Sequence, residues 1–333
     1  MSSVTGASVV DTLGGGEDSG DRASTGRLGD RLFAGAATGS GIIVIGLVTL
    51  VGAFLLYRAI PALADDDANF LTSRVFDVDS SPLRFGIADL LWVTVISSVI
   101  AMIIAVPVAI GVALFITQYA PRRLAAPAAY LVDLLAAVPS IVYGLWGARV
   151  IGSGFNEHVQ DPIQNTVGKH VPFLRDVGIS AGTILLISLV LSIMILPIIT
   201  ALSREVFAQT PPQHKEGAIA LGATKWEMIT TAVLPFGRPG VISAAMLGLG
   251  RALGETIAVT IILSTIPATK PWSFSLFNGG ETFASRIANN ASEFDSPGKT
   301  GAFIAAGLVL FILTFAVNAA ARVVIERRKA FSE

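Results

Sequence analysis

Six long apolar segments, separated by polar ones, make up most of the chain. Each is a continuous run of Val, Ile, Leu and Ala rather than a narrow apolar stripe, which is the pattern of a helix buried on all sides. A membrane with a hydrocarbon core of about 30 Å requires roughly 20 such residues in one helix. The sequence therefore predicts an all-α integral membrane protein with six transmembrane helices. They are expected at about Leu32–Tyr57, Leu90–Gln118, Ala125–Val150, Ile179–Leu202, Val241–Ile266 and Gly301–Val324.

The connecting segments alternate in charge. Arg and Lys precede the first span, occupy the second and fourth connections and end the chain, whereas the other three connections are acidic or mixed. Basic residues near the ends of spans mark the cytoplasmic side, so both termini are expected in the cytoplasm. We divide the chain into a tail at residues 1–30, a six-helix permease-like membrane domain at 31–326 and a basic cytoplasmic C-terminus at 327–333.

The polar segments outside the spans predict little folded structure of their own. The first thirty residues are rich in Gly, Ser, Asp and Thr, and no apolar signal-peptide segment follows a basic start, so a disordered cytoplasmic tail is expected. The outer connections are long and carry aromatic residues such as Trp272, Phe274 and Phe277. Loops of that kind suit contact with an external partner, and folding back over the helices is an equal alternative.

Composition excludes several functional classes. Charged residues make up 14% of the chain and hydrophobic residues 53%, with a mean hydropathy of +0.69, whereas soluble domains carry about 25% charged residues. The net charge of −1 gives no basis for nucleic-acid binding. Cysteine is absent and the three histidines are scattered, so no metal site is expected. No nucleophile–base pair is apparent, and Gly298-Lys299-Thr300 lacks the upstream glycine of a phosphate-binding loop. The sequence therefore predicts a non-catalytic chain without a cofactor, driven by another chain.

The fourth connection predicts a helix–turn–helix between two spans. A short helix around Glu216 would break at Gly222, and a second short helix would stop at Pro235. Pro239 would then open the fifth span in its first turn, where proline is tolerated. A pair of helices lying on the membrane surface is the alternative interpretation.

This connection resembles the "EAA" loop of ABC-importer permeases. The family pattern is E-A-A, three residues, G, nine residues, I, one residue, L-P. The residues Glu216, Ala218, Gly222, Leu234 and Pro235 match it in register.

Two positions depart from the family pattern: Gly217 replaces the first alanine and Ala232 replaces the isoleucine. Glycine and alanine both keep the helix slim, so the resemblance stands. It implies that this loop is the coupling helix that seats in a groove of a cytoplasmic ATPase subunit.

A charged pair occupies the fifth predicted span. Arg251 and Glu255 lie at positions i and i+4, which places them on one helix face where they can neutralise each other. Charged residues at mid-membrane cost about 2.5–3.5 kcal/mol each and are usually kept for function. Because a guanidinium presents a planar fork of donors that suits an oxyanion, the pair predicts an anion pathway. A structural ion pair that fixes helix packing is the alternative.

Proline interrupts the third predicted span. Pro139 removes a backbone donor and frees a carbonyl, which neighbouring serines can help to satisfy. The expected result is a kink that exposes polar groups to the interior of the bundle. Ser140 would line the pathway, and a plain kink without a functional role is the equal alternative.

Two motifs narrow the resemblance to PstC-type permeases of phosphate-specific ABC importers. They are Arg251–Thr256 and Val138–Gly147, and with the EAA loop the resemblance covers roughly residues 85 to 325. Leu253 distinguishes the first motif from the alanine-rich "RAAGET" of the sister PstA-type permeases. The resemblance implies the six-helix type I permease fold in the bacterial inner membrane. Arg251, Glu255, Thr256 and Ser140 are then the expected pathway or gating residues.

The resemblance also implies partners. A PstA-type permease would complete the pathway, two PstB-type ATPase subunits would use ATP and Mg, and a PstS-type external protein would deliver phosphate. A permease for another oxyanion or solute is the alternative within transport. An ion-driven secondary transporter and a flux-sensing membrane scaffold are alternatives from other classes, and the first of these leaves the EAA loop unexplained.

Overall fold

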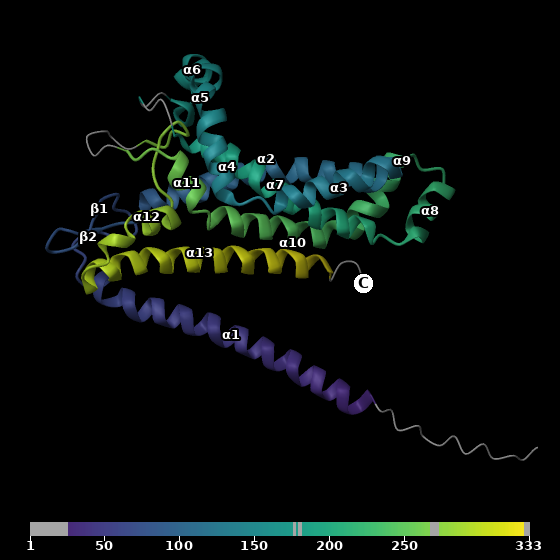
Figure 1. Ribbon diagram of the computed structural model, residues 1–333, viewed down its shortest axis with the longest axis horizontal. Helices are drawn as coiled ribbons and strands as arrows, with labels where there is room; N and C mark the ends of the chain where they lie inside the picture. The colour runs from purple at the N-terminus through teal and green to yellow at the C-terminus, as the bar shows by residue number, and fades with distance from the viewer. Residues whose placement is uncertain (1–25, 176–177, 179–181, 267–272, 330–333) are drawn as a thin grey trace, which may run out of the picture. The chain divides into compact units, whose positions relative to one another are not determined.

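The computed structural model describes residues 26–175, 178, 182–266 and 273–329, which are mostly helical (Figure 1). The membrane part contains α1 (Gly26–Ala64), α2 (Ala88–Leu114), η1 (Phe115–Tyr119), α3 (Arg122–Ala136), α4 (Ser140–Trp146), η2 (Gly147–Ile151), α7 (Ile184–Ala208), α8 (Pro212–Ala220), α9 (Lys225–Met228), η6 (Ile229–Val233), α10 (Leu234–Leu253), α11 (Ile257–Ile262) and α13 (Pro297–Lys329). The shorter elements are β1 (Phe76–Asp77), β2 (Arg84–Phe85), α5 (Gly152–Phe155), η3 (Asn156–Gln160), α6 (Asp161–Asn165), η4 (Val167–Lys169), η5 (Pro172–Leu174), α12 (Phe283–Asn289) and η7 (Ala291–Glu293).

Five of the described helical segments are long and apolar enough to cross a membrane, and a bent pair brings the number to six if it counts as one span. The five are Gly29–Ala64, Ala88–Tyr119, Ile184–Ala208, Lys225–Leu253 and Pro297–Val323. A multi-pass membrane protein is therefore confirmed. The helix α1 begins at Gly26, inside the segment expected as tail, and residues 1–25 lie outside the described ones.

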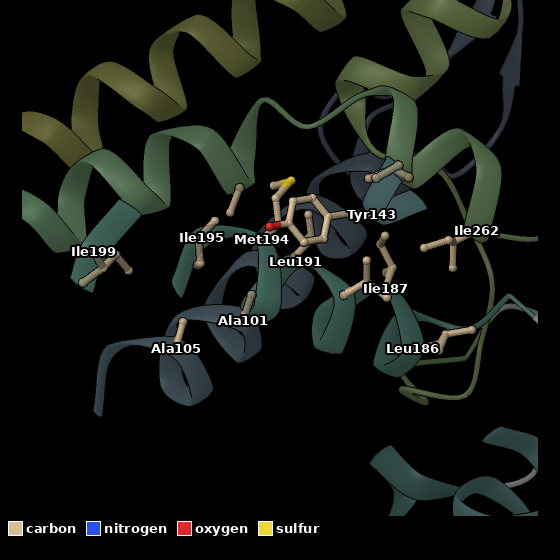
Figure 2. Close-up of a cluster of buried hydrophobic side chains, with 14 of the residues drawn as sticks. Ala101, Ala105, Tyr143, Leu186, Ile187, Leu191, Met194, Ile195, Ile199 and Ile262 are labelled. Atoms are coloured by element: carbon tan, nitrogen blue, oxygen red, sulfur yellow. The ribbon is translucent and has the colours of Figure 1, made fainter. Parts of the chain in front are cut away.

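Residues up to Val51 and residues from Gly52 onward form two compact units, and the packing described here is that of the second. The central helix is α7, against which α2, α3 and α10 pack (Figure 1). On α2, small residues recur every fourth position and are completely or almost completely buried: Ser97, Ala101, Ala105, Ala109 and Ala113. Small side chains at this spacing let two helices approach closely in a membrane. Of these, Ala101 and Ala105 lie in one cluster with bulky residues of α7 such as Leu191 and Ile195 (Figure 2).

A second cluster closes one end of the bundle. The strands β1 and β2 pair antiparallel, with Phe76 opposite Phe85. The Phe76 ring lies 5.3 Å from that of Phe303 on α13, and the guanidinium of Arg286 on α12 lies 4.9 Å above the Phe76 ring. The segment α8–α9 lies at the opposite end of this bundle (Figure 1).

The third predicted span is not one straight helix. The helix α3 and the helical segment Ser140–Asn165 meet at 90°. Pro139 cannot donate a backbone hydrogen bond, and it disfavours helical geometry at Val138. The chain therefore leaves the helix between Ala137 and Pro139, and the expected kink is a sharp bend.

The fifth predicted span also differs from expectation. Its helix starts earlier than expected, at Leu234, and ends at Leu253, before α11 begins at Ile257. Pro239 lies inside α10 rather than in its first turn. The fourth span begins at Ile184, where the Thr183 side chain accepts a hydrogen bond from the Leu186 amide at 3.4 Å. Residues 179–181 of that predicted span lie outside the described residues.

The long connections that were expected on the outer side partly fold back over the helices. Phe277 is fully buried in the main hydrophobic cluster. Phe274 is half exposed and packs edge-on against Trp92 of α2, with 4.9 Å between ring centroids. Trp272 lies outside the described residues.

Candidate pathway and coupling sites

The bend between α3 and α4 is held by a tyrosine rather than by a serine. The Tyr143 hydroxyl donates a hydrogen bond to the Leu135 carbonyl at 2.8 Å. This carbonyl lies in the last turn of α3, where carbonyls lack partners within the helix. Ser140 is the first residue of α4 and is half-buried. Tyr143 lies among Leu191 and Met194 in the core (Figure 2).

Two glycines bring α4 into close contact with its neighbours. A Cβ atom at Gly144 would lie 2.9 Å from the Cα atom of Ala258 on α11. A Cβ atom at Gly147 would lie 2.5 Å from a methyl group of Val190 on α7. Only glycine fits these positions without movement, so the Val138–Gly147 motif serves the packing of α4 against α11 and α7.

The break between α10 and α11 separates the two charged residues of the fifth span. Arg251 lies in the last turn of α10 and is exposed, whereas Glu255 lies in the break and is only 7% exposed. Glu255 Oε1 accepts a hydrogen bond from the Ala258 amide at 3.1 Å, and Thr256 Oγ1 donates one to the Gly254 carbonyl at 3.2 Å. A carboxylate in this position satisfies an open donor at the start of α11.

The predicted Arg251–Glu255 ion pair is therefore wrong. No ion pair joins the two side chains among the residues that the structure describes. The spacing i, i+4 brings side chains together only in an unbroken helix, and the helix ends at Leu253. Arg251 instead lies within electrostatic range of Tyr143 on α4.

The EAA-like loop forms two short helices around a left-handed turn. Glu216 and Gly217 lie exposed on α8, and Ala218 packs partly against the cluster that contains Met228. Gly222 has φ of +87°, a conformation that favours glycine. The turn is confirmed.

The second short helix does not stop at Pro235. The helices α9 and α10 are joined through the π-helical turn η6, and Pro235 is one of the first residues of α10, where its missing amide is tolerated. Leu234 is half-buried against Met228 and Val233. The helical stretch that begins at Lys225 therefore continues through η6 and α10 to Leu253 and includes Arg251.

The start of α9 is fixed locally. Thr224 and Glu227 form a capping box, in which the Thr224 amide donates to the Glu227 carboxylate at 2.7 Å and the Glu227 amide to Thr224 Oγ1 at 3.3 Å. The Lys225 ammonium lies 4.7 Å from the centre of the Tyr119 ring at the end of η1. The loop is therefore preorganised against the end of α2.

Apolar side chains are exposed around the turn of this loop. Leu221 is 91% exposed, and Ile219 and Trp226 are also exposed. A cluster of large apolar side chains in a polar segment is typical of a protein-contact surface. The arrangement suits a partner that covers the turn.

Sequence reasoning missed two features of these sites. Tyr143 belongs to the Val138–Gly147 motif, but its hydrogen bond to Leu135 spans a bend that no helical periodicity indicates. Arg204 was counted with the basic residues of a loop, whereas it lies in α7 and pairs with Asp133 of α3. Within the described residues, no three potential metal ligands lie together.

Comparisons with known proteins agree with this architecture. Residues 94–330 match the sequence family described as "Binding-protein-dependent transport system inner membrane component". The chain is 52% identical over 305 residues to the phosphate transport system permease protein PstC 2 of Mycobacterium tuberculosis, covering 90% of this chain and 92% of that protein. It is 52% identical over 298 residues to PstC of Mycobacterium leprae, covering 89% and 92% of the two chains.

Solved structures resemble the fold at low sequence identity. A chain of the MetNI methionine ABC transporter in an inward-facing conformation has a TM-score of 0.51 and 14% identity, covering 72% of this chain and 94% of that one. A chain of a bacterial ABC transporter that imports alginate has a TM-score of 0.52 and 16% identity, covering 72% and 78%. These likenesses support the ABC importer permease fold.

Proposed function

Because the chain belongs to the family of binding-protein-dependent transport system inner membrane components, we propose that it is the permease subunit of an ATP-driven phosphate importer. Its 52% identity to phosphate transport permeases, over about nine-tenths of both chains, supports phosphate as the substrate. The chain supplies part of the translocation pathway and takes its energy from a partner ATPase.

The pathway site is the exposed guanidinium of Arg251. The Glu255 carboxylate accepts a hydrogen bond from the Ala258 amide at the start of α11, so it does not neutralise Arg251. The exposed charge at the break is therefore positive. A guanidinium offers several donors to a phosphate oxyanion in a fixed planar geometry. Thr256 and Ser140 lie beside the two helix breaks and complete the proposed polar lining.

The role of Glu255 changes accordingly. From the sequence, Glu255 was expected to pair with Arg251 and neutralise it. Instead it fixes the geometry of the break, because its carboxylate holds the first turn of α11 through the Ala258 amide. We assign it a positioning role rather than contact with the anion.

The α8–α9 loop is the proposed ATPase contact. Its exposed Ile219, Leu221 and Trp226 would enter a groove of the ATPase, with Glu216 and Gly217 on the same exposed helix. Both termini and this loop would lie in the cytoplasm of a bacterial cell. A second, PstA-type permease, two PstB-type ATPase subunits with ATP and Mg, and a PstS-type external protein would complete the importer.

The test uses the complete importer purified in mild detergent and returned to vesicles. Phosphate uptake and phosphate-stimulated ATP hydrolysis are measured, with sulfate and molybdate as competitors. Arg251→Gln is expected to lower uptake about tenfold or more, because a charged hydrogen bond contributes about 1.5–3 kcal/mol, while assembly is kept. The matched control is Arg322→Gln, an exposed arginine on α13 away from both breaks. Normal uptake by Arg251→Gln would refute the pathway role, and uptake of sulfate in preference to phosphate would refute the substrate.

A further inference from the structure

An ion pair joins two of the membrane helices. The Nη2 atom of Arg204 on α7 lies 3.3 Å from both carboxylate oxygens of Asp133 on α3. The Arg204 side chain is 17% exposed and that of Asp133 is 47% exposed. Ionisable residues in membrane segments are expensive, pair with one another and mark functional positions.

On one side, the pair is attached to the proposed coupling loop. Arg204 lies in the last two turns of α7, which ends at Ala208, and α8 begins at Pro212. A helix is rigid over a few turns, so a displacement of α8 reaches Arg204 through only a short connection. Figure 1 shows α8 and α9 beyond the end of α7 that carries this residue.

On the other side, the pair is attached to the pathway site. Asp133 lies in the last turn of α3, two residues before Leu135, whose carbonyl accepts the Tyr143 hydroxyl bond. Tyr143 in turn is an electrostatic neighbour of Arg251. A series of neighbouring residues therefore links the end of α7 with the bend beside Arg251.

The geometry of the pair leaves room for a second arrangement. One nitrogen of Arg204, Nη2, is shared between both oxygens, whereas Nη1 is buried without a hydrogen-bond partner among the described residues. A guanidinium normally meets a carboxylate with two parallel bonds. A small slide of α7 along α3 would supply the second bond, so the pair can distinguish two positions of these helices.

We propose that Asp133 and Arg204 are positioning residues for transport, which make the α3–α4 bend follow α7 when the coupling loop moves. They do not contact the transported anion. This inference rests on the proposed function. It assigns the Asp133–Arg204 pair a role in coupling ATP hydrolysis to anion movement, beyond any contribution to the stability of the fold.

The test measures phosphate imported per ATP hydrolysed by the complete importer in vesicles. Asp133→Asn and Arg204→Gln are each expected to lower this ratio at least fivefold while assembly and ATP hydrolysis continue. The charge-swapped variant with Asp133→Arg and Arg204→Asp should return the ratio to within twofold of the original. Lys299→Gln is the matched control, because Lys299 pairs with Asp79 and Asp295 away from α3 and α7, and it should leave the ratio unchanged.

A second measurement remains informative if the swapped variant does not assemble. The chain has no cysteine, so Asp133→Cys with Arg204→Cys can be joined by a bis-methanethiosulfonate linker. The linked importer should lose the uptake that the unlinked double-cysteine variant retains, and reduction of the linker should return uptake to that level. Unchanged ratios in both single variants, or full uptake by the linked importer, would overturn the inference. Failure of the unaltered importer to carry phosphate would contradict the proposed function instead, and the ratio would then be measured with the anion that it does carry.

Discussion

Replacing Gly144 by alanine tests the contact on which the candidate pathway site is built. The added methyl group would lie 2.9 Å from the Cα atom and 3.3 Å from the Cβ atom of Ala258. A backbone atom cannot move aside as a flexible side chain can, so α11 must shift as a whole. Because α11 follows directly on the break that contains Glu255, the shift displaces the Glu255 cap and the end of α10.

The magnitude follows from two opposing effects. Overpacking a close contact costs about 1–3 kcal/mol, and replacing a helical glycine by alanine returns about 0.5–1 kcal/mol. The net destabilisation of Gly144→Ala is therefore expected at about 0–2.5 kcal/mol, with a central value of about 1 kcal/mol. Gly111→Ala on α2 is the control, because nothing lies within 4 Å of its added methyl group, and it should be neutral or slightly stabilising.

The assay is thermal unfolding of the purified importer together with phosphate uptake in vesicles. Gly144→Ala should unfold at a lower temperature and transport more slowly than Gly111→Ala. Equal unfolding temperatures and equal uptake for the two variants would refute the close packing of α4 on α11, and with it the geometry proposed for Arg251.

Three further substitutions separate the parts of the two sites. Tyr143→Phe should destabilise by about 0.5–1.5 kcal/mol, because it removes the hydroxyl bond to the Leu135 carbonyl, which keeps only the Val138 amide as donor; unchanged thermal unfolding would contradict the role of this bond in the bend. Glu255→Gln should keep most uptake because an amide oxygen still caps α11, whereas Glu255→Ala should lose it; equal uptake by both would show that charge, not capping, matters. Gly222→Ala should weaken co-purification of the ATPase, since a left-handed alanine costs about 1–2 kcal/mol, whereas Gly217→Ala should bind normally; equal recovery would contradict the role of the turn.

The sequence predicted the helices well and their interruptions poorly. Hydropathy detects apolar length, and a three-residue break such as Gly254–Thr256 hardly changes the average over a span. The Arg251–Glu255 pair was predicted wrongly for the same reason, because its i, i+4 geometry presupposed an unbroken helix. Pro139 did indicate an interruption, but its 90° angle depends on partners from other helices.

The turn at Gly222 was predicted because glycine itself carries the left-handed conformation. The continuation of the helix past Pro235 was not predicted, because it depends on the π-helical turn η6 before this residue. The contact between Asp133 and Arg204 spans 71 positions of the chain. No local pattern can indicate such a pair, so only the packing of α3 on α7 reveals it.

The π-helical turn η6 has a consequence for how this sequence can change over time. It holds one residue more than an α-helical turn needs, and each residue of an α-helix corresponds to a rotation of about 100°. The wider π-helical turn absorbs this extra rotation, so loss of one residue from Ile229–Val233 would leave a plain α-helix with α10 and Arg251 in nearly the same orientation relative to α9. Single-residue gaps in related chains should therefore be accommodated in this stretch, whereas a gap within α10 itself would rotate Arg251 by about 100°.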